Sequence, residues 1–162
     1  MSIVLYRIDD RLIHGQVVVG WGQPLDVGFI ALVDDAVAES DWEQELYRMG
    51  VPPEMEVVFA SVEQAATLHA AWIADARPGI LLTGDIDTMQ RLADRVSSLR
   101  TVNLGGIHHR AGRTQRLRYV FLTPAEEQSL LALQRRGVHV TAQDVPAARP
   151  LSLDAVLAGQ EN

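Results

Sequence analysis

The sequence predicts an α/β fold, in which a three-layer domain is built on a mainly parallel central sheet flanked by helices. Short apolar runs alternate with helix-like stretches of about 10–15 residues, a pattern typical of βαβ units. The 162 residues match the usual length of one domain, and no repeat, low-complexity tract or long linker divides them. We therefore expect residues 1–162 to form a single domain.

The predicted strands are short apolar runs bounded by turn residues or by helix starts. In chain order they cover residues 3–8, 27–33, 56–60, 80–83, 101–104, 118–122 and 138–141. In such sheets ligands gather at the carboxyl ends of the strands, near a switch in strand order. We therefore expect a site at the loop after the first strand, residues 9–15, and at the loop from Gly105 onward.

The predicted helices begin and end at recognisable capping residues. They cover residues 16–22, 34–50, 62–74, 85–99, 124–136 and 151–157. Ser61 is expected to cap the third of them, with Gln64 as its capping-box partner. Thr123 is expected to cap the helix that begins at Pro124, where two acids in the first turn meet the positive end of the helix dipole. Gly137 ends that helix.

The composition excludes several kinds of chemistry. The chain has no cysteine, which removes disulfides, thiolate metal sites, iron–sulfur clusters and cysteine nucleophiles. It also has no lysine, since all 14 basic residues are arginine. Schiff-base chemistry and the Walker A phosphate loop, which needs a lysine, are therefore excluded.

The charge argues against a nucleic acid or a membrane as the default partner. The net charge is −7, and an acidic protein is a poor binder of nucleic acids and anionic membranes. No signal peptide is visible, and no run approaches the roughly 18 apolar residues of a spanning helix. We expect a cytoplasmic protein without direct membrane insertion.

The first loop concentrates charged residues around a histidine. Arg7, Asp9, Asp10, Arg11 and His14 fall within eight residues, after a strand and before a helix. A histidine near its unperturbed pKa has a lone pair at neutral pH and can attack a phosphoryl group. Arginine matches phosphate oxygens, while a helix start adds backbone N–H groups, with a glycine allowing close approach. A loop hydrogen-bond network without chemistry is the alternative.

These residues carry a family resemblance. The segment RIDDRLIHGQV, followed by Trp21, resembles the phosphorylation site of the IIB components of the mannose/fructose/sorbose family of the phosphoenolpyruvate-dependent sugar phosphotransferase system (PTS). The resemblance continues through residues 103–108, the pair at 112–113, residues 123–127, and residues 137–138 and 145–146. It thus covers nearly the whole chain.

The resemblance implies a concrete function. His14 would accept a phosphoryl group from a phosphohistidine on a IIA domain, itself charged by HPr, and pass it to a sugar imported by the IIC and IID membrane components. Arg11 would stabilise the phosphate, and Asp10 would orient the loop. Support for the phosphate site would come from Gly15, Gln16 and, less directly, Arg7. No metal or organic cofactor is implied, and a homo-oligomer stays open.

The second loop is a further candidate for the site or for docking. Gly105 and Gly106 can bring backbone N–H groups near the same strand ends, and His108 could approach the phosphate or a partner. Arg110 and Arg113 belong to an acid-free arginine stretch that could form a positive docking face for an acidic partner. A solvated basic loop is the alternative for each arginine.

Two rival functions remain at this stage. The same fold could serve as a non-catalytic regulatory or binding module that keeps the loop but phosphorylates no sugar. A nucleotide-binding α/β protein is disfavoured, because the Walker lysine and the GxGxxG fingerprint are both missing. Metal binding is not predicted, because His108 and His109 are adjacent and no ligand spacing is present.

Overall fold

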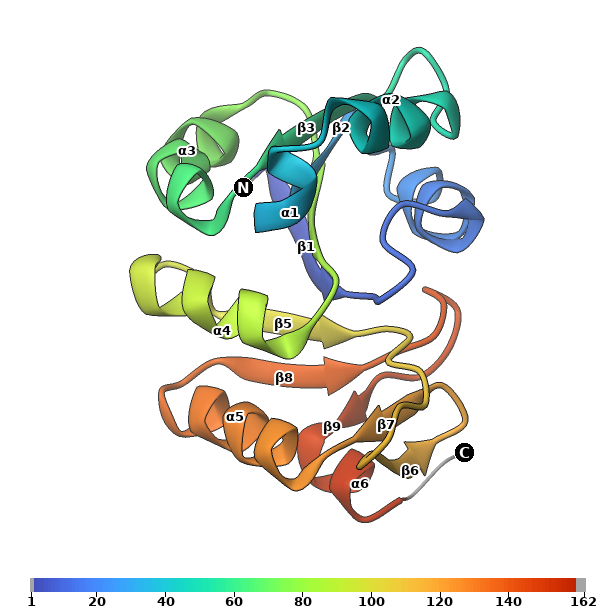
Figure 1. Cartoon of the computed structure of the whole chain (residues 1–162), viewed down its shortest axis with the longest axis vertical. Coiled ribbons are helices and arrows are strands. Elements are labelled where there is room, and N and C mark those ends of the chain that lie inside the picture. Colours follow the sequence, from blue (N-terminus) through green and yellow to red (C-terminus); the bar gives the residue numbers. More distant parts are fainter. Residues whose placement is uncertain (1, 160–162) are drawn as a thin grey trace.

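A central seven-stranded sheet forms the middle layer of the computed structural model, which describes residues 2–159 (Figure 1). Its order is β3-β2-β4-β1-β5-β8-β9, and all neighbours are parallel except β8 and β9. The predicted fold class is therefore confirmed. The strands are β1 (Ile3–Ile8), β2 (Phe29–Val33), β3 (Glu56–Ala60), β4 (Gly79–Thr83), β5 (Thr101–Leu104), β8 (His139–Ala142) and β9 (Leu151–Ser152).

Helices cover both faces of the sheet, and each face has its own hydrophobic core. One core is closed by α3 (Val62–Ala74), α4 (Ile86–Arg95), α5 (Pro124–Arg135) and α6 (Leu153–Leu157). The other is closed by η1 (Gln16–Gly22), α1 (Asp35–Ala38) and α2 (Asp41–Met49). Side chains alternate between the two cores along β2, where Phe29 and Ala31 face the first and Ile30 faces the second. Such two-sided burial explains why the central strands are almost wholly apolar.

The predicted helix 34–50 is wrong as a single element, because the structure divides it into α1 and α2. Asp34 caps α1 by accepting from the amide of Val37, and the chain leaves the helix at Ser40, whose backbone is extended. The side-chain amide of Gln44 then donates to the carbonyls of Val37 and Ala38. Bonds from the second helix therefore satisfy the open end of the first. Similarly, α4 ends at Arg95 and not at residue 99.

The predicted strand 118–122 lies outside the main sheet. It corresponds to β7 (Val120–Leu122), which pairs antiparallel with β6 (Thr114–Leu117) as a separate hairpin. Leu117, Val120 and Leu122 are buried in the first core, which fixes the hairpin against the domain.

The first helix also differs in kind, since η1 is a π-helix, a rare form that is frequent at functional sites.

The topology places the loops after β1 and β5 at a switch point of the sheet, and we call the site that these two loops share the crevice. From β1 the chain runs to β2, which lies toward the β3 edge of the sheet. From β5 it runs to β8, which lies toward the β9 edge. Divergence of two neighbouring connections is the switch point at which ligands bind in such sheets. Backbone bonds join the two loops, from Gly105 N to Ile8 O at 2.7 Å and from Asp10 N to Gly106 O at 2.8 Å.

Candidate functional site

Arg7 forms the buried floor of the crevice. Its side chain is 0% exposed, and Nη1 donates to Asn103 Oδ1 at 2.5 Å and to the carbonyl of Gln143 at 2.9 Å. Nη2 donates to the carbonyl of Asp144 at 3.2 Å, and the guanidinium lies 4.8 Å from the centre of the Trp21 ring. Burial lowers the pKa of Arg7, and nearby acids oppose that shift. The arginine is thus enclosed and acts on the site only through its neighbours.

The Asp9 carboxylate lies close to the two guanidinium groups of the site. The carboxylate is 0% exposed and lies 3.5 Å from Nη2 of Arg7 and 3.5 Å from Nε of Arg11. It also accepts the backbone amides of Arg11 at 3.2 Å and Gly106 at 3.4 Å. A buried carboxylate needs such partners to offset its lost hydration. Asp9 was counted among the charged residues of the first loop but was assigned no role, although its place directly after a buried strand was a usable signal.

His14 is held at one ring nitrogen, Nδ1, while the other lies near Asp9. Nδ1 lies 2.8 Å from the carbonyl oxygen of Leu12, and since a carbonyl only accepts, Nδ1 carries the proton of this bond. Nε2 lies 3.8 Å from Oδ2 of Asp9, is shielded from solvent, and has no hydrogen-bond partner among residues 2–159. The side chain is 19% exposed. Leu12 has φ of 58°, an uncommon left-handed conformation that turns its carbonyl within this loop.

Arg11 is an accessible cation that shares the Asp9 carboxylate with His14. Its side chain is 46% exposed, and Nη2 donates to Oε1 of Gln16 at 2.6 Å. The amide of Gln16 in turn donates to Oδ1 of Asp144 at 2.8 Å, and Asp144 also pairs with Arg118 at 3.3 Å. The loop after β8 therefore completes the site. Asp144 and Gln143 were missed, although the family resemblance at residues 145–146 lies directly after them.

The two glycines of the second loop allow it to approach the first. A Cβ on Gly105 would lie 2.4 Å from Nη2 of Arg7, and one on Gly106 would lie 3.0 Å from Cε1 of His108. Both oxygens of Asp10 bind His108, one through its backbone amide at 2.7 Å and one through Nδ1 at 2.6 Å. These contacts bring Arg7 and Asp10 of the first loop together with Gly105, Gly106 and His108 of the second.

The chain can now be compared with known proteins. The family model for the PTS system sorbose subfamily IIB component matches residues 3–162. This chain belongs to that family. The N-acetylgalactosamine-specific phosphotransferase enzyme IIB component 1 of Escherichia coli K12 is 32% identical to it over 151 residues, covering 90% of this chain and 92% of the relative. The sorbose-specific EIIB component of Klebsiella pneumoniae is 34% identical, covering 85% and 84%.

Solved IIB structures share the fold over almost their whole length. The IIB domain of the sorbose permease from Klebsiella pneumoniae matches with a TM-score of 0.87 and 28% identity, covering 98% of each chain. The N-acetylgalactosamine-specific IIB component 1 of Escherichia coli matches with a TM-score of 0.86 and 29% identity, covering 93% and 98%. IIB components are phosphotransferase-system proteins, which places this chain in sugar transport by that system. No helix within residues 2–159 is both long and apolar enough to span a membrane.

Two arginines of the second loop of this IIB component are engaged within the chain. Arg113 donates to both carboxylate oxygens of Glu126, at 3.0 and 2.8 Å, and its side chain is only 8% exposed. Arg116 pairs with Glu127 at 2.6 Å. These bonds fix the hairpin to the first turn of α5, which leaves exposed Arg110 for the predicted docking face. Its role there stays a prediction.

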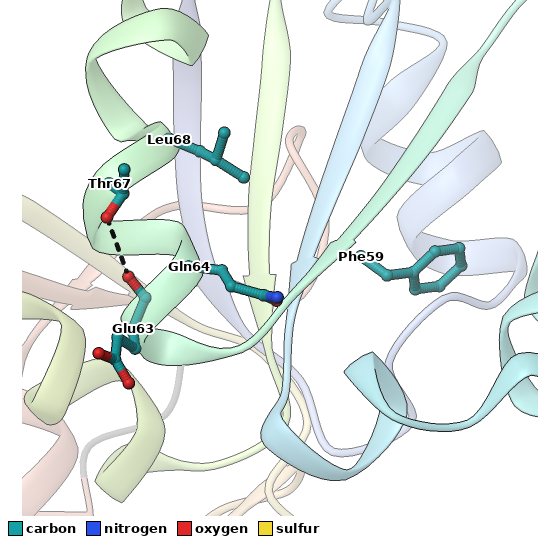
Figure 2. Close-up of a pocket in the computed structure, with 5 residues that line it drawn as sticks. All are labelled: Phe59, Glu63, Gln64, Thr67 and Leu68. Atoms are coloured by element: carbon teal, nitrogen blue, oxygen red, sulfur yellow. Dashed lines mark hydrogen bonds between the residues drawn. The ribbon is translucent and has the colours of Figure 1, made fainter.

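One groove of this IIB component lies away from His14. Its volume is about 490 Å³, and it runs along β3, an edge strand separated from β1 by two others (Figure 2). Glu63 is the only ionisable group in its lining, so the groove offers no nucleophile with an adjacent base. Within the described residues no three histidines or acids gather as a metal site. The groove is lined by Phe59, Glu63, Gln64, Thr67 and Leu68.

Proposed function

We propose that this IIB component is a phosphoryl carrier in which His14 accepts a phosphoryl group from a phosphohistidine on a IIA domain. His14 then passes the group to a sugar imported by the IIC and IID membrane components. The observation that carries the proposal is that one buried carboxylate, Asp9, lies near both the mostly buried imidazole of His14 and the accessible guanidinium of Arg11. The proposed place of action is the cytoplasmic side of that membrane complex.

A family relative supports the IIA link. The mannose-specific EIIAB component of Escherichia coli K12 is 31% identical over 90% of this chain, which covers 45% of that relative. Its printed name joins a IIA to a IIB component. A IIA domain is therefore the natural phosphoryl donor to test.

The proposed transfer is a pair of displacements at phosphorus. A lone pair on one His14 nitrogen forms an N–P bond as the N–P bond of the donor histidine breaks, and the donor nitrogen leaves with the electron pair. In the second transfer a sugar hydroxyl oxygen forms an O–P bond, the N–P bond to His14 breaks, and the hydroxyl proton goes to a base on the acceptor side. The covalent intermediate divides one transfer into two.

The neighbours of His14 are compatible with phosphorylation at either ring nitrogen. Once one nitrogen carries phosphorus, the other is an N–H donor, and the chain offers an acceptor for each: the carbonyl of Leu12 for Nδ1 and Asp9 for Nε2. Either nitrogen must leave its present contact before it attacks. Charge on the three phosphoryl oxygens then needs fixed cations, and Arg11 supplies a permanently charged, planar donor.

The test is phosphorylation by phosphoenolpyruvate, enzyme I, HPr and the cognate IIA domain. We expect one phosphate per chain, labile in acid and stable in base, and none in His14→Ala. His139→Ala removes an exposed histidine from β8 and should label like the unchanged chain. A label that survives His14→Ala, or one stable in acid, would overturn the proposal. Uptake of phosphate without transfer to any sugar would favour a regulatory module.

A further inference from the structure

Asp10 holds His108 in one orientation. Oδ2 of Asp10 accepts the backbone amide of His108 at 2.7 Å, and Oδ1 lies 2.6 Å from Nδ1 of the ring. A carboxylate only accepts, so Nδ1 carries the proton and the ring has one direction in which its outer nitrogen, Nε2, can point. Arg113 adds a second anchor by donating to the carbonyl of His108 at 2.7 Å.

The oriented ring stands at the rim of the His14 crevice. Around Gly106, the position of an added Cβ is 3.0 Å from Cε1 of His108, 3.4 Å from Oδ1 of Asp9 and 3.6 Å from Nη2 of Arg11. The imidazole edge, the carboxylate and the guanidinium therefore flank the same glycine. Asp9 in turn lies 3.8 Å from Nε2 of His14, so this carboxylate connects the surroundings of His108 with those of His14.

His108 is also open to an incoming group. Its side chain is 52% exposed, whereas that of Asp10 is 13% exposed. Two bonds to Asp10 are more than a surface histidine needs to remain in place, but they are what a donor needs if it is to keep a fixed direction. Preorganised donors stabilise charge that develops in a transition state because they need no reorganisation when it forms.

We propose that His108 is a second phosphate-contacting residue of this IIB component and that Asp10 is its positioning residue. The inference rests on the proposed function. In its imidazolium form, with Nδ1–H held by Asp10, His108 donates from Nε2–H to a phosphoryl oxygen as the group passes between its partner and His14. Arg11 binds the phosphoryl oxygens as well. No bond to His108 forms or breaks in this step, and the ring keeps both protons.

Two amide substitutions test the roles of Nδ1 and Nε2 of His108 one at a time. His108→Asn places an N–H near the position of Nδ1, so it can keep the bond to Asp10 but lacks the outer donor. His108→Gln places an N–H near the position of Nε2, so it keeps an outer donor without the bond to Asp10. Comparing them distinguishes a phosphate contact from a loop anchor. His108→Ala removes both nitrogens. Asp10→Asn weakens only the bond that orients the His108 ring.

The experiment is the rate at which phospho-IIA phosphorylates His14 at saturating and limiting donor. Loss of a fully enclosed donor costs about 10²–10³ in rate, and at this half-exposed rim we expect about a tenfold fall in kcat for His108→Ala and His108→Asn. His108→Gln should recover most of that fall, and KM for phospho-IIA should stay within about twofold. A wild-type kcat in His108→Asn, or an effect on KM alone, would make His108 a loop anchor and overturn the proposal.

The final amount of phosphate per chain distinguishes a failure of this proposal from a failure of the proposed carrier function. Every His108 variant should still take up one phosphate per chain at long times, because His14 is intact. Failure of the unchanged chain to label would reject the carrier function itself. A direct readout is the side-chain 15N spectrum, in which Nε2 of His108 should shift on phosphorylation of His14 while the exposed His139 does not. An unmoved His108 signal would also overturn the proposal.

Discussion

The buried carboxylate of Asp9 lies 3.8 Å from Nε2 of His14. The same carboxylate is paired with Arg7 below and with Arg11 at the rim of the crevice. One acidic side chain therefore links the enclosed cation, the accessible cation and the proposed phosphoryl acceptor. Because it is wholly buried, its charge is tied to the fold as well as to the chemistry.

Asp9→Asn should lower both stability and phosphoryl transfer. The substitution keeps the shape of the side chain but leaves Arg7 buried without its counter-charge, and breaking a buried pair in this way costs about 3–5 kcal/mol. Urea denaturation measures the loss. Asp26→Asn is the matched control, since Asp26 is exposed and should change stability by no more than about 0.5 kcal/mol. Equal stability of the two variants would show that Asp9 does not neutralise Arg7.

Arg11→Ala should slow transfer while leaving the fold intact. The guanidinium is 46% exposed and its main bond is to Gln16, so little stability depends on it. Removing one charged donor from a phosphoryl site should cost about 10²-fold in kcat. Arg149→Ala removes an exposed arginine and should leave the rate unchanged. Unchanged transfer in Arg11→Ala would remove Arg11 from the site.

Gly105→Ala should disturb the floor of the crevice, whereas Gly15→Ala should not. An added Cβ at Gly105 would meet Nη2 of Arg7 at 2.4 Å, and Arg7 is enclosed and cannot move aside. Overpacking of this kind costs typically about 1–3 kcal/mol. At Gly15 nothing lies within 4 Å and the backbone is right-handed helical. The midpoints of thermal unfolding compare the two variants. Equal midpoints would contradict the close approach of Gly105 to Arg7.

The sequence predicted what depends on local pattern. The capping boxes Ser61–Gln64 and Thr123–Glu126 are confirmed, because their bonds form within one turn. The alternation of strands and helices also placed the two loops of the crevice correctly. The break at Ser40 was missed, although Ser40 followed three residues later by Glu43 is a helix-start pattern.

The site was predicted at the loops after β1 and β5 but not at the loop after β8. His14, Arg11 and Asp10 were recognised from adjacent residues, but Asp144 reaches the crevice from a loop 128 residues after Gln16. Contacts of that kind arise from strand order, which no local pattern contains. Arg7 was expected near phosphate, and only tertiary packing under Trp21 shows that it is enclosed.

Tyr6 should make the protein lose stability at alkaline pH. Burial raises the pKa of Tyr6 to about 12, against about 10 in an unfolded chain. The native state therefore binds the phenolic proton more tightly, and stability falls as pH rises from about 10 to about 12. Tyr6→Phe should lose less stability over that range, although it also loses the bond to His69 at 2.7 Å. Parallel pH curves from urea denaturation would contradict this.

His69 should make the protein lose stability in mild acid. It is 4% exposed on α3, and burial lowers its pKa below the ordinary value of 6.5, so the native state keeps the ring neutral. The unfolded chain takes up a proton below about pH 6.5, and stability falls as pH decreases from there, by at most about 1.4 kcal/mol per pH unit for this one group. His69→Gln can still bond Tyr6 but does not titrate, so its urea midpoint should change less between pH 7.5 and pH 5.5. His139→Gln replaces an exposed histidine and should keep the full dependence. Identical slopes in His69→Gln and the unchanged chain would show that His69 titrates alike in both states.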